Sequence, residues 1–482
     1  MKLAPYSDYK DSGVPWVGKV PAHWETIKLK MVSKVQTGIT LGKTYERVEL
    51  SEYPYLCVAN VQNGFLNLRR IKTVDVPEKE ASKTKLYQGD VIVTEGGDID
   101  KLGRGSVWKG EIDNCLHQNH IFAIRPDNDR LSPQFLAKIL ESFHGRSYFY
   151  LTAKKTTNLA VTNQKTLGLL PLLLPAIDEQ KTIVRFLEWK TAQINKFIRN
   201  KRRLIELLKE HKQNIINQAV TRGLDPNVKF KPSGVEWIGD IPEHWTVCRL
   251  RNVVSHVTSG SRGWSSYASD DGPLFIRVAN LDRGSLNLKF EDVIRLNLPS
   301  ISETERTKIE PGDILLSITA YIGSVAVAPS TIGEAYVSQH VARCKTRCND
   351  IYSKWLGYVL LSEVGQTHGK LSLYGGTKDG LSLDDVKNYP ILMPPRQEQI
   401  AIVNRTEEKI AKIDQAISRA QREIELMREY RTRMISDVVT GKVDVRGIEV
   451  PEVAEEELLA LEEDTSDADD VIDDEGDLDE TD

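Results

Sequence analysis

Residues Asp178 to Thr221, DEQKTIVRFLEWKTAQINKFIRNKRRLIELLKEHKQNIINQAVT, decide the fold. The stretch contains no Gly or Pro, and Pro175 before it and Gly223 after it are typical start and stop signals of a helix. Its apolar residues recur at helical spacing. They are Ile183, Leu187, Ile194, Ile198, Ile205, Leu208, Ile215 and Ala219. At about 1.5 Å per residue the helix would span on the order of 60 Å, too long for the inside of one compact domain.

A second helix of the same kind is predicted near the C-terminus, over Gln397 to Thr440, with Gly441 closing it. Its apolar residues follow the same spacing. They are Ile402, Ile410, Ile413, Ile417, Ile424, Met427, Met434 and Val438. The approach to each helix also matches, because Pro175-Ala-Ile-Asp-Glu-Gln180 aligns with Pro394-Pro-Arg-Gln-Glu-Gln399. The two helices are therefore a repeat.

A second repeated segment precedes each helix by about 150 residues, and it covers residues 12–30 and 233–251. The positions that coincide are Gly13/Gly234, Trp16/Trp237, Gly18/Gly239, Pro21/Pro242, His23/His244 and Trp24/Trp245. The chain is thus predicted to consist of two copies of a unit of roughly 220 residues, a period that indicates a duplicated domain and not a solenoid.

The region between the repeated segments is mixed. Short β-branched runs alternate there with glycine turns and predict strands. The predicted strands are Tyr55–Val58, Asp90–Thr94 and His120–Ile124 in the first copy, and Leu274–Val278, Asp313–Ile318 and Val325–Ala328 in the second. A helix should follow in each copy, over Pro133–Ser142 and Tyr352–Glu363. Each copy is therefore predicted to contain an α+β domain of about 150 residues.

The loops differ between the copies, although the predicted strands and helices around them match. Glu95–Arg104 stands opposite Thr319–Gly323, and Thr37–Thr44 stands opposite Ser259–Trp264. If the loops read a ligand, the two copies read different ligands.

The overall composition is that of a globular protein, with 40% hydrophobic and 28% charged residues among 482. No apolar run reaches the roughly 18 residues of a membrane helix, and the N-terminus lacks the apolar core of a signal peptide, so we expect a cytoplasmic protein without a membrane partner. Five scattered cysteines suit a reducing compartment. Cys344 and Cys348 lack a second Cys/His pair, so no metal is expected there.

The net charge of −5 hides an uneven distribution. Residues 452–482 hold 17 acidic residues and no Lys or Arg, which leaves 52 acidic against 64 basic residues over 1–451, a net charge of +12. A basic body favours an anionic partner, with nucleic acid the first candidate. The acidic end is predicted to be disordered. It is either a solubilising tail or a DNA mimic that competes for the basic surface.

Catalytic motifs are missing from the sequence. It contains no Gly-x-x-x-x-Gly-Lys-Ser/Thr loop, no Asp/Asn-Pro-Pro-Tyr/Phe tetrapeptide, no His-Glu-x-x-His and no Gly-x-Ser-x-Gly. His23 and His244, beside Trp, favour packing or a hydrogen bond over catalysis. Glu95 and Asp98 could hold a metal, but the second copy has no matching pair. The chain is therefore predicted not to be an enzyme.

Polar and basic loop residues are the remaining candidates, because Arg, Lys, Gln and Asn bind phosphates and base edges. His120 and His340, at matching positions, could touch DNA or only satisfy a strand end. The candidates for DNA binding are Lys43, Arg69, Arg70, Lys101, Arg104, Gln118, Asn119, Lys154 and Lys155 in the first copy, and Arg262, Arg283, Tyr321, Gln339, His340, Tyr374 and Lys378 in the second.

Over residues 1–447 the chain resembles the specificity subunit of type I restriction–modification systems. The motifs that carry the resemblance, each present twice and in the same order, are Val20-Pro-Ala-His-Trp24 and Ile241-Pro-Glu-His-Trp245, Pro175-x-x-x-Glu-Gln180 and Pro394-x-x-x-Glu-Gln399, and the strand starts Gly89-Asp90-Val and Gly312-Asp313-Ile. The acidic end after Val450 departs from the family pattern.

The resemblance implies an α+β protein with two target-recognition domains joined by two long antiparallel helices, related by a pseudo-twofold axis. Each domain would read half of a split double-stranded DNA target, and the helices would set the spacer and dock two methyltransferase subunits. With restriction subunits added, the complex would cleave DNA. Catalytic residues, metal, S-adenosylmethionine, ATP and Mg would belong to the partners and not to this chain.

The predicted domain boundaries follow from these repeats. They are 1–175 for the N-terminal segment and first recognition domain, 176–223 for the central helix, 224–394 for the second recognition domain, 395–447 for the C-terminal helix and 448–482 for the acidic tail. Two rival readings are a DNA nuclease with an unrecognised site, which would cut DNA alone with a metal ion, and a protein-binding coiled-coil adaptor, which would show no salt-dependent DNA affinity.

Overall fold

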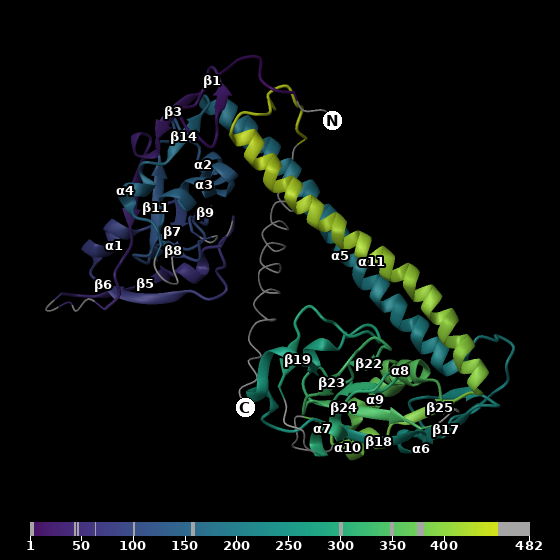
Figure 1. Ribbon diagram of the computed structural model, residues 1–482. Coiled ribbons are helices and arrows are strands. Elements are labelled where there is room, and N and C mark those ends of the chain that lie inside the picture. Colours follow the sequence, from purple (N-terminus) through teal and green to yellow (C-terminus); the bar gives the residue numbers. More distant parts are fainter. Residues whose placement is uncertain are drawn as a thin grey trace. The chain divides into compact units, whose positions relative to one another are not determined.

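The computed structural model describes most of the chain (Figure 1). The described residues are 4–42, 45, 48–62, 64–99, 102–155, 160–297, 302–347, 351–373 and 380–451. Contacts divide the chain into two compact units, which we call unit 1 (Met1–Lys201 with Arg422–Glu480) and unit 2 (Arg202–Gln421 with Thr481–Asp482). No helix among the described residues has the length and apolar character needed to cross a membrane.

The two predicted long helices are confirmed as α5 (Ile177–Arg222) and α11 (Arg396–Val439), which lie side by side (Figure 1). In unit 1, Asn195 of α5 accepts a hydrogen bond from Arg431 of α11 at 3.0 Å, and Lys201 pairs with Glu423 at 2.6 Å. The partner number on α11 falls as the number on α5 rises, so the helices are antiparallel. In unit 2, Lys212 and Asp414 form the corresponding pair at 2.7 Å.

The apolar stripe of α5 is mostly buried as its spacing predicts, but two of the predicted residues, Leu208 and Ile215, are only half-buried. Ile183, Leu187 and Ile205 are buried, but near the C-terminal end Ile216 is buried and the predicted Ile215 only half-buried. The stripe drifts around a straight helix because 3.6 residues per turn do not divide evenly into the spacing. Ile216 joins Ile402 and Ile410 of α11 in the apolar core of unit 2.

Unit 1 contains two main sheets. The first has the order β4 (Ser33–Thr37), β11 (Ile121–Pro126), β7 (Val91–Thr94) and β9 (Gly105–Val107), all antiparallel. The second has the order β10 (Leu116–His117), β5 (Ser51–Leu56) and β6 (Lys72–Val76), with β10 parallel to β5. The helices of this region are α1 (Glu78–Thr84), α2 (Pro133–Glu141), α3 (Phe143–Thr152) and α4 (Gln164–Leu167).

Unit 2 repeats both sheets strand for strand. Its first sheet runs β18 (Val254–Ser259), β24 (Val341–Thr346), β21 (Ile314–Ser317) and β22 (Val325–Val327). Its second sheet runs β20 (Ile294–Leu296), β19 (Ala268–Ile276) and β23 (Ala335–Val337), with β23 parallel to β19. The helices are α6 (Leu250–Val253), α7 (Ser302–Thr307), α8 (Ser353–Leu361), α9 (Glu363–Leu373) and α10 (Leu383–Lys387). The predicted duplication and α+β class are confirmed.

Small antiparallel pairs complete each copy. In the first copy, β1 (Tyr9–Asp11) pairs with β2 (Lys19–Pro21), β3 (Glu25–Lys28) pairs with β14 (Pro171–Leu174), and β13 (Ala160–Val161) pairs with both β8 (Gly96–Gly97) and β12 (Lys154–Lys155). In the second copy, β15 (Phe230–Pro232) pairs with β16 (Asp240–Pro242), and β17 (Thr246–Arg249) pairs with β25 (Pro390–Met393). One detail of the sequence prediction is wrong, because Val58 and Val278 belong to short 3-10 helices and not to strands.

The repeated Glu-Gln pair joins the start of each long helix to its own copy. Glu179 accepts hydrogen bonds from His23, Trp24 and Tyr6 at 2.9, 3.1 and 2.8 Å. Burial, together with Glu179, raises the pKa of Tyr6 far above its usual range. Glu398 makes the matching bonds to His244 and Trp245 at 2.8 and 3.1 Å. The prediction that these histidines serve packing or hydrogen bonding is confirmed.

The repeated Gly-Asp strand starts are also structural. Asp90 accepts the backbone N–H of Tyr87 at 2.9 Å and binds Arg125 through two contacts at 2.7 and 2.8 Å. Asp313 likewise accepts the backbone N–H of Glu310 at 2.8 Å and the guanidinium of Arg343 at 2.5 Å. Each carboxylate therefore closes a turn and ties β7 or β21 to the neighbouring strand.

A buried histidine makes the stability of unit 1 depend on pH. His117 is fully buried, its ring contacts the carbonyl oxygen of Thr84 at 3.0 Å, and burial lowers its pKa from 6.5 to about 4. The unfolded chain then binds more protons than the folded chain between these two values, so stability is lost as pH falls below 6.5. We expect the free energy of unfolding of unit 1 to fall by about 2 kcal/mol between pH 7 and pH 5.

Urea unfolding at both pH values measures this loss, and the second copy supplies the control substitution. Val337 stands where the first copy has His117, so His117→Val should remove about 2 kcal/mol of the pH dependence. An equal pH dependence in the two proteins would show that other groups cause it.

Candidate nucleic-acid interface

A buried asparagine shapes the loop that carries Arg69 and Arg70. Asn60 accepts the backbone N–H of Cys57 at 2.8 Å, and its amide nitrogen donates to the carbonyl oxygens of Asn67 at 2.8 Å and Arg70 at 2.9 Å. One side chain thus satisfies three backbone groups and fixes the path of the loop. Both arginines are exposed on it.

A polar cluster lies where β10 leads into β11. Gln118 accepts the backbone N–H of Val58 at 3.3 Å, just before Asn60, and His120 contacts the carboxylate of Glu95 at 2.8 Å. The loop after β4 packs against this turn so closely that a Cβ on Gly38 would lie 2.0 Å from the carbonyl oxygen of His117. The candidates Gln118 and Asn119 are therefore held on a rigid turn and are half-buried.

Two exposed lysines reach the same region through the small sheet. Glu95 is followed directly by β8, β8 pairs with β13, and β13 pairs with β12, which consists of Lys154 and Lys155. The ammonium of Lys155 lies 4.4 Å from the ring centroid of Tyr150. Arg104 is half-buried, and its carbonyl oxygen accepts the backbone N–H of Thr94 at 3.0 Å, at the end of β7.

In the second copy, a buried asparagine holds the equivalent loop through the same set of hydrogen bonds. Asn280 accepts the backbone N–H of Arg277 at 2.9 Å, and its amide nitrogen donates to the carbonyl oxygens of Lys289 at 3.2 Å and Asp292 at 2.8 Å. This loop carries Arg283, whose guanidinium lies 3.3 Å from the ring centroid of Tyr321. The stacked pair presents a planar cation and an aromatic face, and Tyr321 is 43% exposed.

The loop that carries Tyr321 has an unusual backbone. Ala320 and Tyr321 have φ angles of 35° and 29°, a conformation that costs roughly 1–2 kcal/mol per L-residue. Ser317 compensates by donating its hydroxyl to the carbonyl oxygens of Thr319 and Ala320 at 2.7 and 2.9 Å. Ser324 donates to the carbonyl oxygen of Tyr321 at 3.0 Å. Strain held in this way at an exposed aromatic residue is typical of a binding site.

The strand-end candidates of the second copy are also brought together. His340 is hydrogen-bonded to Thr319 at 2.7 Å and to Gln339 at 2.9 Å. Gly260 packs on this turn as Gly38 does in the first copy, because its Cβ would lie 2.0 Å from the carbonyl oxygen of Val337. Arg262 follows two residues later and is exposed.

Four of the predicted candidates, Lys43, Lys101, Tyr374 and Lys378, lie outside the described residues. Cys348 and the acidic segment 452–482 lie outside them as well. Within the described part of the chain, no group of three or more His, Cys, Asp or Glu side chains is arranged to hold a metal ion.

Sequence reasoning missed Asn60 and Asn280, which organise the loops. The signal was present, because Val58-Ala-Asn60 and Val278-Ala-Asn280 are identical tripeptides at the offset of the duplication. In both copies the result is a rigid frame that presents Arg, Lys, Gln and Asn side chains, the groups that bind phosphate oxygens and base edges.

Comparison with known proteins identifies the family of this chain. The family model of the type I restriction modification DNA specificity domain matches residues 21–207 and 286–426. The chain is 24% identical over 436 residues to the putative type I restriction enzyme MjaX specificity subunit of Methanocaldococcus jannaschii, with 89% of this chain and 96% of that protein covered. It is 25% identical over 401 residues to the type I restriction enzyme EcoBI specificity subunit of Escherichia coli, with 81% and 80% covered.

A solved structure supports the fold. It is described as "Structural basis underlying complex assembly and conformational transition of the type I R-M system", and it matches with a TM-score of 0.62 at 18% identity, covering 88% of this chain and 99% of that one. Since the family model matches more than half of the sequence, in both copies, the chain belongs to the family of type I restriction–modification DNA specificity subunits.

Proposed function

We propose that this chain directs a type I restriction–modification complex to an asymmetric, bipartite double-stranded DNA target, each copy reading one half. One observation carries the proposal. The buried asparagines Asn60 and Asn280 hold equivalent loops in the same way, while the side chains on these loops differ. A repeated frame with different loop residues suits two half-sites of different sequence, as dimeric readers use two half-sites of equal sequence.

The long helices would set the spacer between the half-sites and dock two methyltransferase subunits. A helix converts length into distance at about 1.5 Å per residue. On this proposal the recognition domains are 1–175 and 224–394, the helices 176–223 and 395–447, and the acidic tail 448–482. Restriction subunits would add cleavage. The chain itself would be non-catalytic and work in the cytoplasm, with S-adenosylmethionine, ATP and Mg on the partner subunits.

A map of methylated adenines in host DNA, with this gene intact and deleted, tests the function. We expect a split motif whose methylation disappears on deletion, and the motif gives both half-sites and the spacer at once. If both maps are the same, salt-dependent DNA binding by the chain with its neighbouring subunits decides, since a DNA reader loses affinity steeply as salt rises. Salt-independent or absent binding would refute the proposal.

The stacked pair Arg283 and Tyr321 should act on one half-site only. Arg283→Ala or Tyr321→Ala is expected to lower methylation at the intact target by about 10–100-fold, because one base contact or stacking contact contributes roughly 1–3 kcal/mol. The sequence requirement should relax in the half-site read by the second copy and stay unchanged in the other. Methylation of a target library measures both effects.

The control is Lys229→Ala, an exposed cation in unit 2 that precedes β15. It should leave the sequence requirement of both half-sites intact. An equal relaxation of both half-sites by Arg283→Ala would contradict the assignment of one copy to one half.

A further inference from the structure

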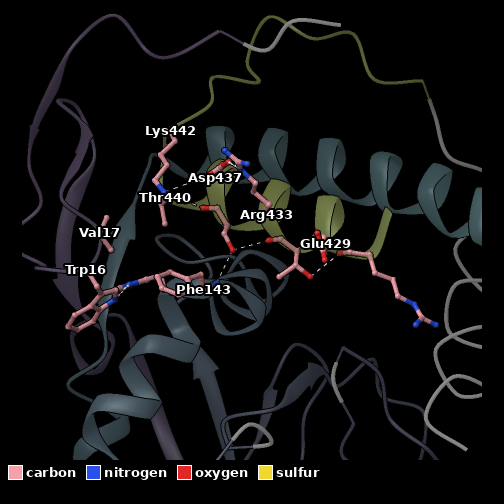
Figure 2. A pocket seen from close by; sticks show the side chains of 12 residues that line it. Trp16, Val17, Phe143, Glu429, Arg433, Asp437, Thr440 and Lys442 are labelled. Carbon is pink, nitrogen blue, oxygen red and sulfur yellow. Dashed lines mark hydrogen bonds and ion pairs between the residues drawn. The ribbon is translucent and has the colours of Figure 1, made fainter. Parts of the chain in front are cut away.

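A groove in unit 1 runs between α3 and the last turns of α11. It contains a cavity of about 620 Å³, and Figure 2 shows Trp16, Val17 and Phe143 on one side and Arg433 and Asp437 of α11, with Thr440 just after the helix, on the other. A second cavity, of about 480 Å³, shares Trp16 and Phe143 and extends along α3. Together they form a continuous apolar groove, which we call the α3 groove.

The α3 groove exposes more apolar surface than scattered surface residues account for. Phe143, Tyr150 and Leu151 are 62%, 58% and 61% exposed, and all three belong to α3. A contiguous apolar patch of this kind marks an interaction site on a soluble protein. The cavity that they line therefore needs an occupant.

The rim of the α3 groove is basic. Arg428, Arg433 and Lys442 line the first cavity and Arg146 lines the second, against the acidic residues Glu429 and Asp437. Asp437 already pairs with Arg433 at 3.5 Å and with Lys442 at 3.4 Å. These four cations outnumber the two carboxylates, and the net positive charge of the lining favours an apolar occupant flanked by carboxylates.

The second copy keeps the backbone of this region and the exposed apolar side chains Trp237 and Leu371, but not the aromatic side chains of Phe143 and Tyr150. The backbone N–H of Phe143 donates to Ser436 of α11 at 2.9 Å, and the backbone N–H of Glu363 donates to Asn217 of α5 at 2.9 Å. The side chains differ, because Glu363 stands in place of Phe143 and Lys370 in place of Tyr150. A partner that binds both copies alike would not need these two aromatic side chains on one copy alone. A single occupant per chain would need them only once.

We infer that this occupant is residues 453–463 of the chain itself. The segment reads VAEEELLALEE, and Ala454, Leu458 and Leu461 stand at i, i+4 and i+7, the spacing of one helical face. Five glutamates flank that face and would meet the basic rim of the α3 groove. The two aromatic side chains that distinguish this groove, Phe143 and Tyr150, occur at these positions in the first copy only.

The chain leaves α11 at the α3 groove, so the segment can reach it. Lys442 lines the first cavity, and Asp444 forms an isolated bridge with Ala4 in the same unit. Residues 443–451 are folded against unit 1, with Val445 buried, so the reach is that of the chain beyond Pro451, at most roughly 3.3–3.6 Å per residue. Docking would cover the apolar side chains of α3 with the apolar face of the segment and pair its carboxylates with the rim.

A binding experiment on the full chain tests the inference. Leu458→Asp with Leu461→Asp removes the apolar face of the tail and should leave the α3 groove open. A fluorescein-labelled peptide of residues 451–466 should then bind this variant and be followed by anisotropy. The wild-type chain, whose own tail competes, should bind the peptide at least about tenfold more weakly.

Substitutions borrowed from the second copy locate the binding. Added to the tail variant, Phe143→Glu or Tyr150→Lys should weaken the peptide at least about tenfold, while Leu371→Lys, at the position in α9 that corresponds to Leu151, should change nothing. A scrambled peptide of the same composition should not bind. No binding to the tail variant, equal binding after Phe143→Glu, or equal binding of the scrambled peptide would each overturn the inference. Loss of a methyltransferase subunit on Phe143→Glu, without peptide binding, would overturn it in favour of that partner.

Discussion

Replacing Gln180 with leucine is expected to lower the free energy of unfolding of unit 1 by about 3–5 kcal/mol. Gln180 is fully buried at the start of α5. Its side-chain oxygen accepts the backbone N–H of Ser132 at 2.9 Å, and its nitrogen donates to the carbonyl oxygens of Arg130 and Pro175 at 2.8 and 2.9 Å. Leucine has a similar volume but leaves three backbone groups without partners, one in a buried and two in part-buried surroundings, each costing about 1–3 kcal/mol before relaxation.

The second copy provides an independent repetition of this experiment. Gln399 is equally buried, accepts the backbone N–H of Tyr352 at 2.8 Å and donates to the carbonyl oxygen of Pro394 at 2.9 Å. Gln399→Leu should therefore destabilise unit 2 and spare unit 1. Urea unfolding, with limited proteolysis to tell the units apart, measures both. Gln218→Leu, on the exposed side of α5, should change stability by less than about 0.5 kcal/mol. A loss as small for Gln180→Leu would show that the Glu-Gln pair does not anchor the helix.

The helices were predictable because their signal is local. The observed ends of α5, Ile177 and Arg222, lie one residue outside the predicted ones, since Gly223 after the helix and the uninterrupted apolar spacing define it within the sequence. The strands β7 and β21 were found for a similar reason, because a glycine turn precedes a short apolar run. The domain boundaries as drawn from the repeats remain a prediction.

The sheet order and the groove could not be predicted in this way. The parallel pairing of β10 with β5 joins residues about 60 positions apart, and a single strand carries no signal for its partner. The α3 groove combines Trp16, Phe143 and Arg433, which only the folded chain brings together. Asn60 escaped notice because a buried asparagine that fixes a loop has no sequence pattern of its own, apart from its repetition at Asn280.

Gly441→Ala is expected to destabilise unit 1 by about 2–4 kcal/mol. The loss has two causes, backbone strain at a positive φ and a steric clash of the added Cβ, and alanine substitutions at other glycines separate them. Gly441 ends α11 with φ at 73°, and a Cβ there would lie 2.2 Å from Cδ of Pro21. Gly13, in the same unit, has φ at 71° but no atom within 4 Å of the added Cβ. Gly13→Ala should therefore report the backbone strain alone, about 1 kcal/mol, and the difference between the two variants in urea unfolding measures the clash.

Gly223 ends α5 in the same way, with φ at 71°, but its Cβ would lie 3.2 Å from the ring of Trp245, a contact that a small shift relieves. Gly223→Ala should consequently cost unit 2 about 1–2 kcal/mol, between the other two variants. Equal losses at Gly441 and Gly13 would mean that Pro21 moves aside freely. The expected order instead follows from how each copy is closed. The Pro-x-His-Trp segment packs against the start of one long helix through Glu179 or Glu398, and against the end of the other through Gly441 or Gly223. Each copy is thus completed by both long helices, by the start of one and the end of the other.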